Sequence, residues 1–421
     1  MNAPYHPFMD RWHPDDYRFE EIQALKEAIR AKENRLVLSI PDIGLSNLMR
    51  FLVTRSDWGQ RRVTFAYLDC DTLNYGPKQT QLSTHLFNEM AHQFHEQGLG
   101  DEPEVNIQGY ERFQRYIKNV VGGQLDRLVV VVNKADRLLF RADEAFYRRL
   151  RALTDLNKRL CFIFATSEQI QIQSSTHYQF FAGRQLIVKP FNDRDLVGAI
   201  IEEGQRIEMT FDANDRTKLA RLTGGHAGLL RAVTSVIREE KLDLSEEDTE
   251  LVMKLIKGES VTSRCLRIMQ VLERTQQAAL RDIARGQSGL VKRDTLAWLQ
   301  RFGLVNFIHG SYSVFSPILA RYVIAEKGAA TLERVTSADG KFFRRDEEIS
   351  VRPKAQKLLA YFLTKPEQVL TYDEIAWHVW DTNIGVTNES ISGLVRELRR
   401  ALGSGYIKTH HSRGYEFINP P

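Results

Sequence analysis

The 421-residue sequence predicts an α/β domain with a parallel sheet, followed by a mainly helical region and a small C-terminal domain. Two observations predict the first part: apolar runs alternate with amphipathic stretches between residues 18 and 191, and these apolar runs are continuous. A parallel sheet buried on both faces needs such runs in its strands. A third observation, a helix with one polar and basic face followed by a short hairpin, predicts the last part.

The composition is that of a globular protein, with 43% hydrophobic and 27% charged residues. The net charge of +4 permits a nucleic-acid partner without requiring one. Three distant cysteines without a Cys-x-x-Cys pair indicate neither a disulfide framework nor a metal site. Because the chain has no signal-peptide pattern and no run of about 20 apolar residues, we expect a soluble, cytoplasmic protein without a membrane partner.

The α/β domain is expected to span 1–191 and to open with an amphipathic helix at 18–33. Further helices are expected between the strands, including 80–97 and 110–123. The expected strands are the apolar runs 36–40, 63–69, 128–132, 160–167 and 184–191.

The stretch "LSIPDIGLSNLMRFL" has the outline of a phosphate-binding loop: a strand, a glycine turn and a helix. A P-loop requires G-x-x-x-x-G-K-[ST], in which the lysine reaches the phosphates and the hydroxyl holds Mg²⁺. Gly44 and Ser46 fit this pattern, but Ser39 stands at the first glycine and Leu45 at the lysine. A charge-assisted contact worth about 1.5–3 kcal/mol is therefore missing. Asp42 also adds an anion where phosphate oxygens would lie.

A second ATPase motif is altered as well. After a buried strand, an ATPase places acidic residues that hold Mg²⁺ and orient water. Here Asn133 and Lys134 follow the strand, and neither side chain can act as a general base. We therefore expect the fold to be kept and hydrolysis to be lost, so that the protein is not an enzyme and has no catalytic residue.

After residue 191 the sequence becomes helical, apart from a strand-rich patch at 303–317. We expect a helical lid at 192–254 and a winged helix at 255–328, because three helices followed by a hairpin give the order of a winged helix. The final domain is expected at 329–421.

This final domain carries the strongest functional signal. In "TNESISGLVRELRRALG", apolar residues repeat at spacings of four, three and four, so one helix face is apolar and the other polar and basic. The hairpin "YIKTHHSRGYEFI" follows at once. Such a helix can enter the major groove of duplex DNA while a basic hairpin grips the phosphates. The basic and imidazole side chains near the hairpin tip are Lys408, His410, His411 and Arg413.

The segments "LLAYFLTKP", "EIAWHVW", "VRELRRAL" and "IKTHHSRGYEFI" resemble the OmpR/PhoB-type winged-helix DNA-binding domain of response regulators. The resemblance covers residues 332–420 and implies double-stranded DNA as the partner. It puts Glu389 where the family often has a basic or polar contact residue. The candidate DNA-binding residues are Asn388, Glu389, Ser392, Gly393, Arg396 and Arg400 on the helix, and Lys408, His411 and Arg413 in the hairpin.

Earlier segments resemble a degenerate STAND or Orc/Cdc6-like AAA+ ATPase module over residues 20–325. They are "RFEEIQALKEAI", "IPDIGLSNLMRFL", "LVVVVNKADRLL", "CFIFATS" and "LTGGHAGLLRAV", in this order. The resemblance implies a P-loop-NTPase-like (AAA+/STAND) fold in which Thr166 or Ser167 is the first sensor residue and His226 and Arg231 face nucleotide. His226 can equally cap or pack a helix. The candidate nucleotide site comprises Gly44, Leu45, Ser46, Asn133, Lys134, Thr166, His226 and Arg231, and it leaves open ATP or ADP binding without hydrolysis.

Together these features predict a DNA-binding transcription regulator, with a degenerate ATPase-like module as sensor or oligomerisation platform. We expect a homo-oligomer, because one winged helix contacts only a short half-site. Two alternatives remain open. One is an active or nucleotide-gated ATPase that remodels DNA or nucleoprotein, of the initiator or transposition type. The other is an adaptor subunit of a defence or mobile-element complex, with protein partners.

Overall fold

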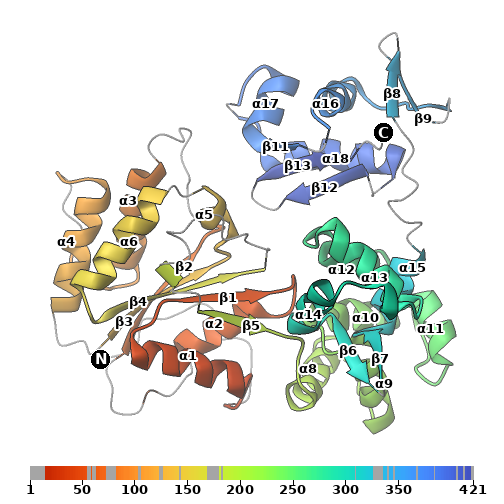
Figure 1. Cartoon of the computed structure of the whole chain (residues 1–421), viewed down its shortest axis with the longest axis horizontal. Helices are drawn as coiled ribbons and strands as arrows, with labels where there is room; N and C mark the ends of the chain where they lie inside the picture. The colour runs from red at the N-terminus through yellow and green to blue at the C-terminus, as the bar shows by residue number, and fades with distance from the viewer. Residues whose placement is uncertain are drawn as a thin grey trace.

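A computed structural model gives the architecture of the chain (Figure 1). None of its described helices is long and apolar enough to cross a membrane. The residues that the structure describes are 15–54, 58, 63–72, 82–102, 106–122, 127–141, 144–167, 180–181, 184–308, 310–325, 335–338, 341–344, 347–366, 368–383, 385–403, 406–410 and 413–418.

The first domain contains a five-stranded parallel sheet with the strand order β2-β3-β4-β1-β5. Every residue of β4 is buried, as is every residue of β3 after its first, so the prediction from continuous apolar runs is confirmed. The strands are β1 (Arg35–Ser39), β2 (Val63–Asp69), β3 (Arg127–Asn133), β4 (Leu160–Thr166) and β5 (Gln185–Val188).

Helices cover both faces of this sheet, with α3, α4 and α6 on one side and α1 and α2 on the other (Figure 1). The helix α2 begins directly after the glycine turn of the loop that follows β1, as the sequence predicts. The helices are α1 (Phe19–Ala31), α2 (Leu45–Thr54), α3 (Leu82–Glu96), α4 (Gly109–Gly122), α5 (Asp136–Arg141) and α6 (Glu144–Leu156).

The region from Asp193 to Ala325 is helical, and its described residues contain one two-stranded hairpin. The expected helices and hairpin are present, and a further helix, α15, follows the hairpin. The helix α10 packs on α12, and α9 packs on α15. The residues predicted as a lid and a middle winged helix belong to one hydrophobic core with the α/β domain, and the boundary between them stays a prediction. The elements are α8 (Asp193–Arg206), α9 (Ala213–Thr223), α10 (Ala227–Glu240), α11 (Asp248–Leu255), α12 (Glu259–Gln270), α13 (Arg274–Ala284), the 3-10 turn η2 (Ser288–Leu290), α14 (Arg293–Arg301), β6 (Val305–Ile308), β7 (Ser311–Val314) and α15 (Pro317–Ala325).

The C-terminal domain has a separate core between three helices and a three-stranded sheet of order β11-β13-β12. A second small sheet, β10-β9-β8, precedes the helices. Gly414 has a φ of +143°, and a Cβ there would lie 1.8 Å from the carbonyl oxygen of Leu370, so only glycine lets β13 pair with β11. The elements are β8 (Val335–Ala338), β9 (Lys341–Arg344), β10 (Glu347–Glu348), α16 (Pro353–Thr364), β11 (Val369–Thr371), α17 (Tyr372–Trp380), α18 (Asn388–Leu402), β12 (Ile407–His410) and β13 (Gly414–Phe417).

Candidate nucleic-acid interface and phosphate-loop site

Helix α18 presents one polar face because its apolar face is fixed in the C-terminal core. The Thr387 side chain caps the helix by accepting a hydrogen bond from the backbone N–H of Ser390 at 3.2 Å. Gly403, with a φ of +104°, ends it. The buried residues of α18 are Ile391, Leu394, Val395, Leu398 and Leu402.

The predicted DNA-binding residues of α18 differ in their exposure. Asn388, Glu389, Arg396 and Arg400 are exposed, whereas Ser392 and Gly393 are half-buried. The Ser392 hydroxyl lies 3.0 Å from the hydroxyl of Tyr415 on β13. Ser392 therefore links the helix to the hairpin, and the exposed cations of this face are the two arginines.

The hairpin of β12 and β13 lies beside this helix. Arg413 is exposed at its turn, Lys408 is half-buried on β12, and His411 lies outside the described residues. The His410 Nε2 and Glu416 Oε2 atoms are 2.5 Å apart. Burial acts to raise the pKa of the Glu416 carboxyl, but the hydrogen bond and charge of His410 outweigh it and lower this pKa.

Arg399 has a structural role that the sequence analysis did not assign. Its guanidinium donates to the carbonyl oxygen of Ile407 at 2.8 Å and to the Thr409 hydroxyl at 2.7 Å. Burial lowers the pKa of this guanidinium. Arg399 therefore fastens α18 to β12, and its position between the buried residues Leu398 and Leu402 is the sequence signal that could have indicated this.

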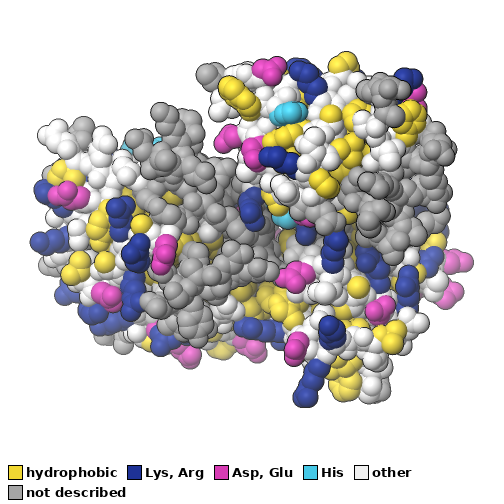
Figure 2. All heavy atoms as spheres, turned by 45° about the horizontal axis from the view of Figure 1, so that its top comes forward, with side chains coloured by type: hydrophobic (Ala, Val, Ile, Leu, Met, Phe, Trp, Pro, Cys, Tyr) yellow, Lys and Arg dark blue, Asp and Glu magenta, His cyan; other side chains and the backbone are white. Residues whose placement is uncertain are grey.

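Basic, acidic, histidine and hydrophobic side chains are interspersed on the face of the C-terminal domain shown in Figure 2. No single sign of charge dominates that face. On this face an anion would therefore be attracted by particular side chains rather than by a broad positive field.

The second candidate site is the loop at residues 41–46, where the lysine of a P-loop is absent. Leu45 is 8% exposed and belongs to the hydrophobic core. The Ser46 hydroxyl accepts a hydrogen bond from the Asn133 amide at 3.1 Å. Ser46 and Asn133 stand where an ATPase holds Mg²⁺ and orients water, and here their side chains are hydrogen-bonded to each other. Thr166 lies nearby, since its strand neighbour on β1 is Leu38, and it is buried.

Lys134 is turned toward acidic side chains at the end of β2. Its Nζ atom lies 2.5 Å from Asp71 and 3.3 Å from Asp69. Partial burial acts to lower the pKa of Lys134, but the hydrogen bonds and charges of these two carboxylates outweigh it and raise this pKa. Its charge is therefore already neutralised within the domain.

His226 joins the lid to the loop. Its Nδ1 atom accepts the backbone N–H of Leu229 at 3.0 Å, which caps α10, and its Nε2 donates to the carbonyl oxygen of Pro41 at 2.8 Å. Complete burial lowers its pKa to about 4, so the imidazole is neutral. The capping and packing role is thus present, while Arg231 is exposed on α10.

Two further contacts hold this loop, and the sequence analysis missed both. The buried Arg18 donates to the carbonyl oxygens of Ile43 at 2.9 Å and Lys189 at 3.0 Å. The Asp42 carboxylate forms ion pairs with two arginines of α12, Arg264 at 2.9 Å and Arg267 at 3.0 Å. These partners are distant in sequence, so no local pattern could have indicated them.

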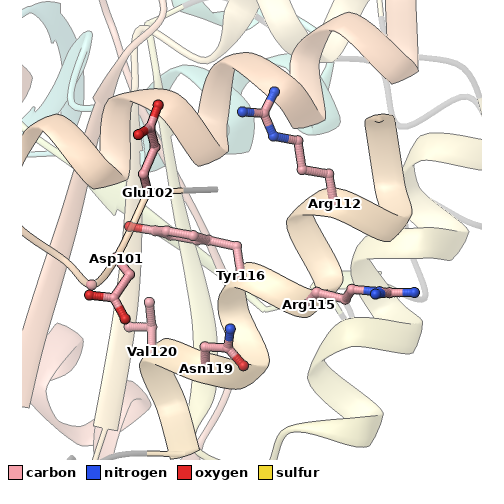
Figure 3. A pocket seen from close by; sticks show the side chains of 8 residues that line it. Asp101, Glu102, Arg112, Arg115, Tyr116, Asn119 and Val120 are labelled. Carbon is pink, nitrogen blue, oxygen red and sulfur yellow. The ribbon is translucent and has the colours of Figure 1, made fainter. Parts of the chain in front are cut away.

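A small pocket of about 130 Å³ lies elsewhere, against α4 (Figure 3). Carboxylates of Asp101 and Glu102 face the side of α4 that carries Arg112 and Tyr116, and the Tyr116 hydroxyl donates to the carbonyl oxygen of Leu99 at 2.7 Å. The pocket mixes both signs of charge and shares no lining residue with α18 or with the loop at 41–46.

Comparison with known proteins identifies the C-terminal domain. Residues 346–417 match the family described as "Transcriptional regulatory protein, C terminal". The phosphate regulon transcriptional regulatory protein PhoB of Klebsiella pneumoniae is 25% identical over 39% of this chain and 70% of its own length. PhoB of Escherichia coli K12 is 31% identical over 24% of this chain, which spans 44% of that regulator. The transcriptional activator CadC of Escherichia coli K12 is 30% identical over 20% of this chain and 18% of its own length.

Solved structures similar to this chain cover about three quarters of it. A Walker-type ATPase of Pyrococcus abyssi has a TM-score of 0.47 and 17% identity, covering 73% of this chain and 95% of that one. The Aeropyrum pernix ORC2 protein in its ADP form has a TM-score of 0.44 and 14% identity, covering 78% and 97%.

These findings define the classes to which the two parts are similar. The C-terminal segment is a DNA-binding transcription-regulator domain of the OmpR/PhoB type, as predicted. The five-stranded parallel sheet with helices on both faces confirms that the first domain is α/β, as predicted. Its AAA+-like character stays a prediction.

Proposed function

We propose that this protein is a transcription regulator that binds duplex DNA through α18 and the β12–β13 hairpin. The observation that carries the proposal is the exposure of Arg396, Arg400 and Arg413 within the segment that matches the regulator family. With α18 in the major groove, a guanidinium can bond guanine or phosphate oxygens, while the hairpin turn contacts the backbone. Arg399 and Ser392 hold the helix and hairpin in fixed relation, which limits the ordering needed on binding.

We further propose that the ATPase-like module is degenerate and serves as a sensor or oligomerisation platform. Leu45 is buried, Asn133 bonds Ser46, and Lys134 is paired with two carboxylates. No acidic side chain follows β3 where hydrolysis needs one. Binding of ATP or ADP without turnover would be a signal input, and side-by-side association of two or more copies would place two C-terminal domains on two half-sites.

The test is duplex-DNA binding across a salt series, with and without ATP, by the full chain and by Arg396→Ala/Arg413→Ala. Each lost phosphate contact lowers the slope of log affinity against log salt by about 0.9, so the double variant should lose up to about 2. The matched control is Lys354→Ala/Lys357→Ala, which removes two positive charges from α16, where they contact Trp380 and Asp381. It should leave the slope nearly unchanged.

Other outcomes would favour the alternatives. Equal loss in both double variants would indicate a general charge effect and not a specific interface. Binding that appears only with ATP would indicate a nucleotide-gated remodelling ATPase. Unchanged binding in Arg396→Ala/Arg413→Ala, or no duplex binding at all, would favour an adaptor.

A further inference from the structure

Asp42 occupies an unusual position in the loop after β1. Its φ is +61°, in the left-handed region that non-glycine residues rarely adopt. Its carbonyl oxygen accepts the backbone N–H of Gly228, at the start of α10, at 2.8 Å. A Cβ on Gly228 would lie 2.6 Å from the Cβ of Asp42, so the lid closes directly on the loop.

Two guanidinium groups converge on the Asp42 carboxylate. Arg264 contacts Oδ2 at 2.9 Å and Arg267 contacts Oδ1 at 3.0 Å, so each carboxylate oxygen has its own arginine. The two arginines are three residues apart on α12 and therefore share one helix face. Their side chains are 33% and 38% exposed, so an anion can reach them from solvent.

The arginine pair has more donors than a carboxylate uses. The Arg267 Nε atom is buried and has no hydrogen-bond acceptor among the described residues. A phosphate group has more acceptor oxygens than a carboxylate and a higher charge, and arginine forks match it well. The loop itself supplies no lysine for a phosphate, because Leu45 stands at that position.

We propose that Arg264 and Arg267 form a binding site for a phosphate group, and that the Asp42 carboxylate fills this site as an internal ligand. The closed arrangement of loop, lid and α12 is thus held without nucleotide. This inference rests on the proposal that the module does not hydrolyse ATP. A phosphate-bearing ligand must displace Asp42 from the two arginines. Its apparent association constant is therefore the intrinsic constant multiplied by the fraction of molecules in which Asp42 does not occupy the site.

The test removes the internal ligand and leaves the arginines. Asn accepts left-handed backbone conformations, so Asp42→Asn removes the charge with little backbone strain. The measurements are calorimetric binding of inorganic phosphate and the thermal midpoint of the full chain, at constant ionic strength set with chloride. If Asp42 fills the site in nine molecules of ten, Asp42→Asn should bind phosphate about tenfold more tightly than the wild type. Phosphate should also raise the lowered midpoint of the variant.

Two controls make the outcome specific. Asp42→Asn combined with Arg264→Gln/Arg267→Gln should lose the gain in phosphate binding. Asp248→Asn breaks a comparable ion pair with Arg221 and Lys218 inside the lid, but Lys218 keeps the Glu246 carbonyl as an acceptor. Its phosphate response should match that of the wild type.

Asp42→Gly provides a second variant, because glycine adopts this backbone conformation freely. Equal phosphate affinity in the wild type and in either Asp42 variant would overturn the proposal. A gain that persists without the two arginines would overturn it as well. Both results are independent of duplex binding through Arg396 and Arg413, so failure here is distinguishable from failure of the regulator proposal.

Discussion

The loop at 41–46 and the surface of α18 use charged side chains in opposite ways. Around the loop, the cations Arg264, Arg267 and Lys134 are bound to carboxylates of the same chain. On α18, Arg396 and Arg400 are exposed. In our proposal the arginines at the loop bind an external anion only when Asp42 is displaced, whereas the two arginines of α18 are already exposed on the surface.

The largest expected effect comes from breaking the scaffold of the C-terminal domain. Gly414→Ala would place a Cβ 1.8 Å from the Leu370 carbonyl oxygen, so β11 and β13 must separate. We expect a loss of about 3 kcal/mol or more in the free energy of unfolding of this domain, at the upper end of overpacking effects because the close contact is with backbone, and loss of duplex binding. Urea unfolding followed by circular dichroism measures it. Wild-type stability in this variant would show that the hairpin is not fixed by β11.

The next effect concerns the loop and is pH-dependent. The unfolded chain protonates His226 near pH 6.5, whereas the folded pKa is about 4. Since the unfolded state binds the proton first, stability is full above pH 6.5 and is lost as the pH falls toward 4. At about 1.4 kcal/mol per pKa unit, the loss approaches about 3 kcal/mol.

Urea unfolding at pH 7 and pH 4.5 measures this loss. The control is His226→Asn, which can still cap α10 but cannot titrate. This variant should remove most of the pH dependence of the free energy of unfolding of the part whose core contains the loop. The same pH dependence in wild type and variant would assign it to other groups.

A smaller effect separates two neighbouring arginines of α18. Arg399→Ala should lower the stability of the C-terminal domain by about 1–3 kcal/mol, because the Ile407 carbonyl oxygen and the Thr409 hydroxyl, both partly buried, lose their donor. Arg396→Ala should change stability by less than about 0.5 kcal/mol, yet weaken duplex binding. Thermal unfolding and fluorescence anisotropy with labelled duplex measure the two quantities. If both variants changed stability alone, or both changed duplex binding alone, the structural role of Arg399 and the DNA-contact role of Arg396 would be wrong.

The smallest effect is expected at Gly393. A Cβ there meets nothing within 4 Å, and the residue lies inside a helix. Gly393→Ala should therefore stabilise the domain by about 0.5–1 kcal/mol. Gly393 is predicted to face the DNA groove, so duplex binding is measured as well as stability. Destabilisation would indicate that the helix packs more closely there than described.

The sequence predicts those features of the fold and of the candidate sites whose signal lies within one short stretch of residues. The strands β3 and β4 were predictable because their continuous apolar runs are five and six residues long. The strand β11 has three residues, too few for a periodic pattern, and it was missed. The loop was recognised from its local sequence. Its partner was not, because Arg264 lies 222 residues from Asp42 in the sequence and only folding brings the two side chains together.

The same limit applies to α18. Its amphipathic spacing predicted four of its five buried residues and missed Leu394, and four of the six candidate contacts on it are exposed. The spacing could not separate Arg399 from Arg400, because their difference arises from the neighbouring strand β12 and not from the helix itself.

The two hydrophobic cores have a consequence for how such chains arise. The described core of the C-terminal domain, from Val335 to Phe417, shares no residue with the core that runs from Tyr17 to Val323. Either part can therefore be exchanged by recombination near residue 330 without repacking the other. The C-terminal domain can in this way be joined to a different first part while both hydrophobic cores stay as they are.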